Sequence, residues 1–512
     1  MATLSSLDLI IIVGYLLLLA GIGAYFSRQQ TSLDAFLIGG GTISWLPVGL
    51  SLMAALNSGI DYLTQPSATI QFGLVLALGT LSWFVIYPWV AYVAFPFFRR
   101  LNVYSIYEYL EDRFDVRVRT LAAVIFIAWR VGWMATALYV PCLAIHAASG
   151  GAIDLTVMIV IAGVLVTLYT MLGGIQAVIW NDVIQFTVMF GGLGATVWIV
   201  AGSAPGGVSE IWQVAQAAGK TDLWVPIGGG VAGFLQQPMT VPALMCAVII
   251  GRMAQYTTDQ TMALRVQSTR TTADARHAFI VNAAGDALWM LGLTFVGLAL
   301  FAYFQRTPAP EGLSSDRLLP YFMTQVFPAG AVGLVNAAIL AASLSSVDAA
   351  IHSGSSVLVV DLYNRLIKRR RLQRLDSKPA GDGPEQVRAL RIATIVMGVI
   401  GTTLACNVEG LGSLLEINKK VTDSFAGPLF GIFLLAMFSP RSASTAALTG
   451  GLVGALSSYL VAFHSSLSFF WPSTFGLVAT VVVGYAVSLV TAPPSAEVQG
   501  QTWRGVMSRA TD

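Results

Sequence analysis

Charged side chains are scarce in this sequence. Asp, Glu, Lys and Arg make up 11% of the 512 residues, whereas 56% of the residues are hydrophobic. A soluble domain is about 25% charged, because it must present a large surface to water. The low charged fraction therefore excludes a soluble globular protein and indicates that lipid covers most of the surface.

Cysteine and an excess of either charge are also lacking. The chain has 3 cysteines and a formal net charge of +2. An odd number of cysteines in apolar stretches does not form a disulfide framework, and a nearly neutral chain does not attract nucleic acid or an acidic partner. Because the sequence contains no evident nucleophile–base pair or cluster of metal ligands, we do not expect an enzyme. Nothing in it predicts an obligate protein partner.

Long apolar runs, in contrast, are abundant. A bilayer core about 30 Å thick needs roughly 20 apolar residues of helix to cross it. This rule predicts about thirteen spans, with the approximate ranges 7–26, 43–71, 74–98, 119–147, 154–172, 177–202, 230–256, 277–304, 330–360, 389–407, 411–438, 443–464 and 470–491. We expect the first to be a retained span and not a cleaved signal, because Asp8 precedes it and Arg28 follows it.

The distribution of basic residues predicts the orientation of these spans. With the N-terminus outside, most of the 28 Lys and Arg residues fall in cytoplasmic segments. These include the long polar loop from Arg365 to Arg391 and a segment to which we assign Arg252 and Arg265. We therefore expect a multi-pass protein of the cell (inner) membrane with a cytoplasmic C-terminus.

Two of the predicted spans contain helix-breaking residues. The second span includes LNSGIDYLTQP (56–66), and the seventh includes LQQPMTVP (235–242). Proline removes a backbone donor and clashes with the preceding turn, and backbone freed at membrane depth must be buried in protein or line a cavity. Broken helices in corresponding positions of two halves are typical of inverted-repeat transporters that bind substrate at the membrane midplane. Ordinary proline kinks are the alternative.

Several stretches, in the same order, resemble the sodium/solute symporter family, which includes sodium-coupled sugar, sialic acid, iodide and monocarboxylate transporters. The matching stretches are SLMAALNSGIDYLTQP (51–66), LYTMLGGIQAVIWNDVIQ (168–185), TDQTMALRVQSTRTTADAR (258–276), AASLSSVDAAIHSGSSVLVVDLY (341–363) and FAGPLFGIFLLAMFSPRSA (425–443). The resemblance implies an all-α, LeuT-type 5+5 inverted-repeat fold and alternating access. Its third stretch matches a cytosolic motif of the family.

The resemblance also implies a division of the chain. The expected parts are an extra N-terminal span at 1–28, a first five-helix repeat at 41–202, a second at 225–438, two C-terminal spans at 441–492 and a cytosolic tail at 493–512.

A sodium site is expected where the first broken helix meets the helix that follows residue 330. Sodium is a hard cation that prefers oxygen ligands, and residues three or four apart share a helix face. By resemblance, the ligands are the carbonyls of Ala54, Asn57 and Ala342 and the hydroxyls of Ser345 and Ser346. Without the family, two such serines are usually packing residues or bond to their own backbone.

Some family members bind a second sodium, and here this sequence departs from their pattern. Asp182 stands at the carboxylate position, but the two hydroxyl positions are occupied by Asp348 and Ala349. Two nearby carboxylates hold a cation or share a proton. We therefore predict a second cation or proton site at Asp182 and Asp348, with an ion pair to Arg130 or another basic residue as the alternative.

Ionisable and amide side chains within the spans are candidates for the solute site. They are Ser58, Asp61, Gln65, Arg130 and Gln236. Arg130 resembles the carboxylate clamp of the sialic acid members, because guanidinium offers a planar fork to a carboxylate. An internal salt bridge from Arg130 to Asp61 or Asp182 is the alternative.

These observations predict sodium-coupled symport of a small organic solute, either a carboxylate or a sugar-like compound, by alternating access. The expected partners are the solute, Na+ and the lipid bilayer. Two alternatives remain: a proton-coupled symporter of the same fold, and a transporter-like solute sensor.

Overall fold

A computed structural model describes residues 5–26, 33–101, 103–368, 384–408 and 414–509. Within these ranges the chain forms helices joined by loops and turns, together with one isolated β-bridge between Ile43 and Thr269. The predicted all-α fold is therefore confirmed. Residues 369–383, in the predicted polar loop, lie outside the described residues, as do 1–4 and 27–28 of the predicted N-terminal part and 510–512 of the tail.

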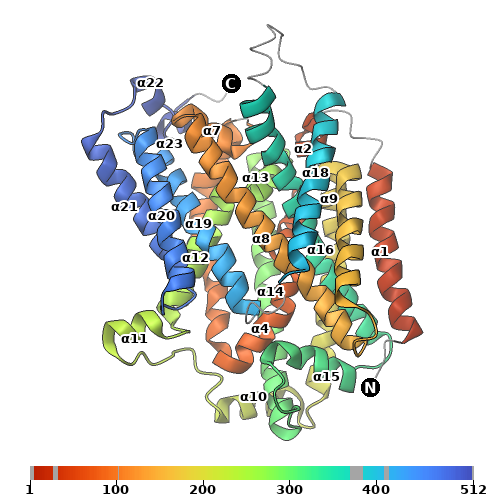
Figure 1. The fold of residues 1–512 in the computed structure, drawn as a ribbon. Helices are drawn as coiled ribbons and strands as arrows, with labels where there is room; N and C mark the ends of the chain where they lie inside the picture. Colours follow the sequence, from red (N-terminus) through yellow and green to blue (C-terminus); the bar gives the residue numbers. More distant parts are fainter. Residues whose placement is uncertain (1–4, 27–32, 102, 369–383, 409–413, 510–512) are drawn as a thin grey trace.

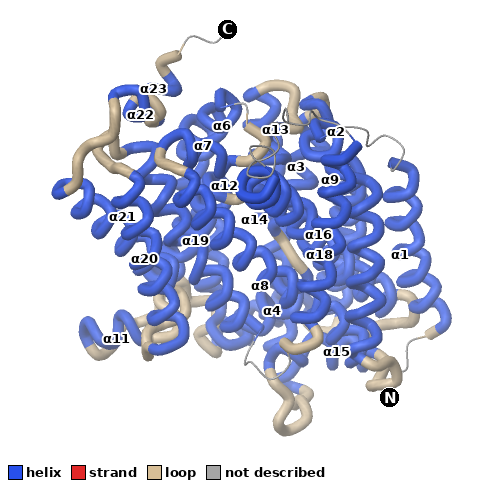
Figure 2. The backbone as a smooth tube through the Cα atoms, turned by 45° about the horizontal axis from the view of Figure 1, so that its top comes forward, coloured by secondary structure: helices blue, strands red, loops and turns tan. Residues whose placement is uncertain are grey.

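Long helices run between two faces of the molecule, and several short helices lie at those faces (Figures 1 and 2). The main elements are α1 (Ser6–Phe26), α2 (Leu33–Ile38), α3 (Trp45–Leu56), α4 (Gly59–Phe72), η3 (Gly73–Leu81), α5 (Ser82–Trp89), η4 (Val90–Ala94), α6 (Phe95–Leu101), α7 (Ile106–Arg113), α8 (Val116–Ala148), α9 (Leu155–Gly202), α10 (Gly207–Ala217), α11 (Gly230–Gln236), α12 (Val241–Thr258), α13 (Gln260–Gln267), α14 (Thr272–Arg306), α15 (Leu318–Val326), α16 (Ala331–Val357), η6 (Leu358–Lys368), α18 (Pro384–Ala405), α19 (Leu414–Phe438), α20 (Ser444–His464), α21 (Pro472–Val490), α22 (Ala496–Gln499) and α23 (Trp503–Met507).

The number of helices that qualify as spans is smaller than the predicted number of spans, because two helical stretches are long enough to cross a membrane twice. Among the described residues there are 10 helices long and apolar enough to cross, or up to 11 if a bent pair counts as one span. The stretches 59–101 and 155–202 contain 43 and 48 residues, whereas about 20 suffice. In α9 the helix breaks at Gly174, whose φ of 57° and ψ of −163° are not helical. Its two arms match the predicted spans 154–172 and 177–202.

The first predicted break lies between α3 and α4. Asn57 leaves the helix with φ −101° and ψ 125°. Ser58 then caps α4, because its hydroxyl accepts a hydrogen bond from the Ile60 amide at 3.1 Å, and the Asp61 carboxylate accepts one from the Ser58 amide at 2.8 Å. This reciprocal capping starts a new helix, so the carbonyls at the end of α3 have no partner within their own helix.

The second broken helix differs from the prediction. The chain does bend by 46° between α11 and α12, where the prolines were expected to act. A further break follows at Asp259, which has φ −94° and ψ 114° and separates α12 from α13. We had assigned this segment to the cytoplasmic side, together with Arg252 and Arg265. Both arginines are instead tied to carboxylates, Arg252 to Asp286 and Arg265 to Asp182, and such pairing offsets the cost of burying their charges.

Helix α16 forms the centre of the molecule, with 94% of its most apolar window buried. Helices α9, α8, α1 and α18 pack against it, as do α3 and α4 on either side of the first break. Helices α20 and α21 lie at the opposite edge of the molecule from α1, whereas α10, α11 and α15 lie at the face opposite the C-terminus (Figure 1). A break in α3–α4 is therefore held against the most buried helix of the protein.

Gly59 makes this close approach possible. A Cβ at this position would lie 2.3 Å from the Ser343 hydroxyl oxygen and 2.6 Å from the Ile339 carbonyl oxygen of α16. We expect Gly59→Val to lower the free energy of unfolding by about 1–3 kcal/mol, because overpacking forces helices apart. Thermal unfolding in detergent measures the effect. Gly191→Val in α9 is the control, since no atom lies within 4 Å of its Cβ position; equal melting temperatures for the two variants would contradict this account.

Candidate functional site

Unpaired carbonyls at the end of α3 face the hydroxyls of α16. The Ser345 hydroxyl donates to the Ala54 carbonyl at 2.8 Å and to the Ala342 carbonyl at 2.9 Å. The Ser346 hydroxyl lies 3.3 Å from the Ala55 carbonyl oxygen and 3.4 Å from that of Asn57. The structure thus brings together all the oxygens that the resemblance assigned to a sodium site. The Ala55 carbonyl joins them and was missed.

This oxygen cluster suits a hard monovalent cation. Both serines are fully buried, and Asn57 is 1% exposed. The cluster consists of main-chain carbonyls from an interrupted helix and hydroxyls from an intact one, which is the donor set that unwound membrane helices offer to Na+. The hydroxyl protons now bridge between oxygens. A cation bound here would replace those hydrogen bonds with direct contacts to the same oxygens.

The two acidic residues of the predicted second site lie close to each other in the core. The Asp182 carboxylate accepts from the Ser51 hydroxyl at 2.5 Å and from the Arg265 guanidinium at 2.9 Å. The Asp348 carboxylate accepts from the Tyr169 hydroxyl at 2.9 Å and is near enough to Asp182 for their charges to interact. Asp182 therefore has an ion-pair partner, and that partner is Arg265.

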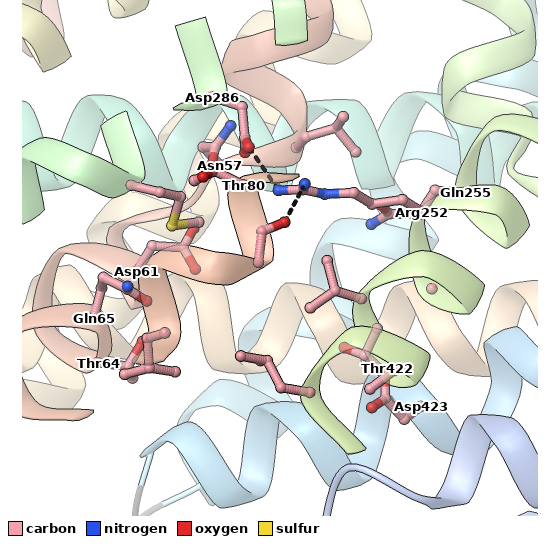
Figure 3. A pocket seen from close by; sticks show the side chains of 18 of the residues that line it. Asn57, Asp61, Thr64, Gln65, Thr80, Arg252, Gln255, Asp286, Thr422 and Asp423 are labelled. Atoms are coloured by element: carbon pink, nitrogen blue, oxygen red, sulfur yellow. Dashed lines mark hydrogen bonds and ion pairs between the residues drawn. The ribbon is translucent and has the colours of Figure 1, made fainter. Parts of the chain in front are cut away.

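A cavity of about 190 Å³ adjoins the break in α3–α4 (Figure 3). Of the predicted residues, Asn57, Asp61 and Gln65 line it. The other lining side chains come from α4, α8, α12, α14, α19, the segment that follows α4 and the loop before α21; they include Thr64, Thr80, Trp83, Trp133, Arg252, Gln255, Asp286, Thr422, Asp423 and Phe470.

Arg252 is the cavity residue that sequence reasoning missed. Its guanidinium lies 2.6 Å from the Asp286 carboxylate (Figure 3). It also lies 2.5 Å from the Ser82 hydroxyl and donates to the Gly79 carbonyl at 3.1 Å. The guanidinium carbon also lies 4.1 Å from the centroid of the Trp83 ring, whose Nε1 donates to the same Asp286 oxygen at 2.6 Å. The signal was present in the sequence, because Arg252 and Asp286 are both charges within apolar helices.

The three other predicted solute residues lie elsewhere. Ser58 acts as the cap of α4, and Arg130 forms an ion pair with Asp259, not with Asp61 or Asp182. Gln236 lies at the end of α11, donates to the Ser466 hydroxyl at 3.2 Å, and lines a separate cavity of about 480 Å³. That second cavity also contains Glu416 and Lys420.

Comparisons with known proteins show what the whole chain is similar to. The sequence model of the sodium:solute symporter family matches residues 36–454. The chain is 31% identical to the sodium/sialic acid symporter SiaT of Proteus mirabilis, covering 94% of this chain and 95% of that protein. It is also 31% identical to human sodium-coupled monocarboxylate transporter 1, covering 87% of this chain and 72% of the relative.

Solved structures support the fold. A Na+-coupled sialic acid symporter, determined in a substrate-bound outward-open state, superposes with a TM-score of 0.85 at 29% identity and covers 96% of this chain and 99% of its own. The nucleobase-cation-symport-1 family transporter Mhp1 shares the fold, with a TM-score of 0.57 at 14% identity over 91% of this chain and 97% of its own. The predicted LeuT-type fold is thus confirmed.

Ser345 offers a direct test of the oxygen cluster. Ser345→Ala removes one hydroxyl ligand, so we expect the sodium affinity to fall about tenfold, or about 1.4 kcal/mol. The measurement is the melting temperature as a function of sodium concentration at constant ionic strength, because a ligand stabilises the state that binds it. Ser355→Ala is the matched control, since the Ser355 hydroxyl is also buried in α16 and donates to a carbonyl of its own helix at 2.8 Å. An unchanged sodium response in Ser345→Ala would refute the site.

Proposed function

Because this chain belongs to the sodium:solute symporter family and is a sodium-coupled transporter, we propose that it carries a small organic carboxylate through the membrane together with Na+. The oxygen cluster between α3 and α16 binds the ion, and the cavity beside it binds the solute. The ligands are the carbonyls of Ala54, Ala55, Asn57 and Ala342 and the hydroxyls of Ser345 and Ser346.

Asn57 carries this proposal, because it belongs to both sites. Its carbonyl oxygen lies 3.4 Å from the Ser346 hydroxyl, and the same residue lines the cavity. A cation that binds this carbonyl holds the break in one conformation and so organises one wall of the cavity. Sodium then raises the affinity for solute through its own preference for that conformation, as linkage requires.

The transport cycle follows from this coupling. Sodium stabilises an outward-open state that accepts the solute, and inward opening then releases both. The route from outside is the second cavity, since it contains Gln236 of α11 at the face opposite the C-terminus (Figure 1). Adjacent residues, Phe469 and Phe470, line the second and the first cavity, respectively. This route agrees with an inner-membrane orientation in which the N-terminus is outside and the C-terminus is cytoplasmic.

Arg252 and its neighbours support a carboxylate as the solute. A guanidinium presents a planar fork of donors that matches a carboxylate, and Arg252 is already oriented by Asp286, Ser82 and the Trp83 ring. Gln65, Thr64 and Gln255 offer hydrogen bonds for hydroxyl groups on the same solute. The solutes in the names of two relatives, sialic acid and monocarboxylates, are carboxylates too.

We further propose that Asp348 and Asp182 form a second cation site. Arg265 supplies one positive charge to two buried carboxylates. The cluster therefore has one negative charge without a described counter-charge when both carboxylates are ionised, and a cation bound beside Asp348 balances it.

Sodium-driven uptake tests the function. In proteoliposomes we expect an inward sodium gradient to drive accumulation of a sugar acid such as sialic acid, or of a short monocarboxylate, and to support counterflow. The reason is that the ion and the solute share Asn57. Uptake driven by a pH gradient but not by sodium would select proton coupling, and binding without counterflow would select a sensor. Uptake of neutral sugars alone would contradict the carboxylate assignment.

Asp348→Asn tests the second cation site. Removal of one negative charge leaves Asp182 paired with Arg265 and no excess charge for a second ion, so we expect fewer sodium ions per solute. The number of sodium ions per solute is obtained from the membrane potential and sodium gradient at which a given solute gradient produces no net flux. The proposal fails if the variant keeps both the wild-type stoichiometry and the wild-type pH profile of transport.

A further inference from the structure

The break between α12 and α13 is built like the break between α3 and α4, but it contains a carboxylate. Asp259 is 1% exposed and caps α13, since its carboxylate accepts from the Thr261 amide at 2.8 Å. The Thr258 carbonyl at the end of α12 accepts from the Tyr107 hydroxyl at 2.7 Å. The helix end is thus satisfied, and the Asp259 charge remains to be balanced.

Arg130 of α8 supplies that balance. It forms an ion pair with Asp259 and is 3% exposed. Its guanidinium carbon also lies 4.9 Å from the Trp129 ring centroid and 5.6 Å from that of Phe126. From the same helix, Trp133 lines the solute cavity. Arg130 precedes it by nearly one helical turn and faces the break.

In the two five-helix repeats that the resemblance implies, at 41–202 and 225–438, the two breaks occupy equivalent places. The first break interrupts the first helix of the first repeat and contacts α16, which is the third core helix of the second repeat. The second break interrupts the first helix of the second repeat and contacts α8, which is the third core helix of the first repeat. At the contact between the first break and α16, carbonyl and hydroxyl oxygens that suit a sodium ion lie together. At the contact between the second break and α8, the Arg130 guanidinium pairs with the Asp259 carboxylate.

We propose that Arg130 is a built-in cation that occupies, at the α12–α13 break, the place that sodium occupies at the α3–α4 break. This inference rests on the sodium-site assignment proposed above. Arg130 is then a positioning residue for the hinge and does not contact the solute. Because guanidinium does not deprotonate and cannot dissociate from the chain, this hinge stays tied to α8 throughout the cycle, whereas the first hinge is released when sodium leaves.

Replacement of the guanidinium by a free ion tests this idea. Arg130→Met leaves the Asp259 carboxylate without its partner, so a small cation should take the vacated position. In Ser345→Ala/Arg130→Met, which also lacks a ligand of the first site, we expect Na+ or Li+ to raise the melting temperature relative to N-methylglucamine at equal ionic strength. Ser345→Ala alone should show a smaller response, because it retains only a weakened first site and the proposed site at Asp182 and Asp348, and the further change Asp259→Asn should reduce the response of the double variant to that of Ser345→Ala.

Arg119→Met in the Ser345→Ala background is the matched control, because Arg119 pairs with the buried Asp361 and neither residue belongs to a break. An equal cation response in this control would show a general effect of unpaired carboxylates and would overturn the proposal. A response in Ser345→Ala/Arg130→Met no larger than that of Ser345→Ala would also overturn it. Wild-type protein that does not respond to sodium would instead refute the first site, so the two failures are distinguishable.

Arg130→Lys keeps a positive charge beside Asp259. It provides a second test of the proposal if Arg130→Met does not fold. We expect this variant to melt close to wild type in N-methylglucamine and to show no additional sodium response. Its KM for a transported carboxylate should stay close to wild type while the maximal rate falls, because the altered residue holds a hinge. A KM raised about tenfold for carboxylates only would identify Arg130 as the solute clamp and would contradict the hinge role.

Discussion

Unpaired carbonyl oxygens at the end of α3 are the constraint on which the rest of this structure depends. A helix that stops in the membrane leaves its last carbonyls without partners, and lipid cannot satisfy them. Here the hydroxyls of Ser345 and Ser346 meet them inside the protein. This requirement explains why α16 is the most enclosed of the long apolar helices and why Gly59 must lack a side chain where α4 begins. We propose that sodium coupling uses the same oxygens.

Buried charge in this protein is arranged in pairs that join different helices. Arg265 of α13 binds Asp182 of α9, and Arg252 of α12 binds Asp286 of α14. Arg119 of α8 binds Asp361 of η6 in the same way. Each pair is expensive to bury and more expensive to break, so such pairs fix which helix faces lie together. The breaks themselves carry few such charges, which leaves the first one free to respond to an exchangeable ion.

Much of the fold could be predicted from the local pattern of apolar and helix-breaking residues. The apolar runs predicted the spans, because a bilayer demands a fixed length of helix. The residues around Asn57 and Pro66 predicted the first break, and the spacing of three and four residues from Ala342 to Ser345 and Ser346 placed this group on one helix face. The second break was harder to locate. The prolines at 238 and 242 do bend the chain, but the interruption that mirrors the first lies at Asp259, where no proline or glycine marks it.

The sequence by itself determined that the chain crosses a membrane many times and where its second predicted span is interrupted, because these properties depend on composition and on neighbours within a few residues. The oxygens expected to bind sodium there followed from the family resemblance. Only the tertiary structure decided how the buried charges pair. Arg130 meets Asp259, and Arg252 lies in the cavity, because a side chain's partner is set by which helices pack together and at what depth. Residues this far apart in the chain carry no local signal of that choice.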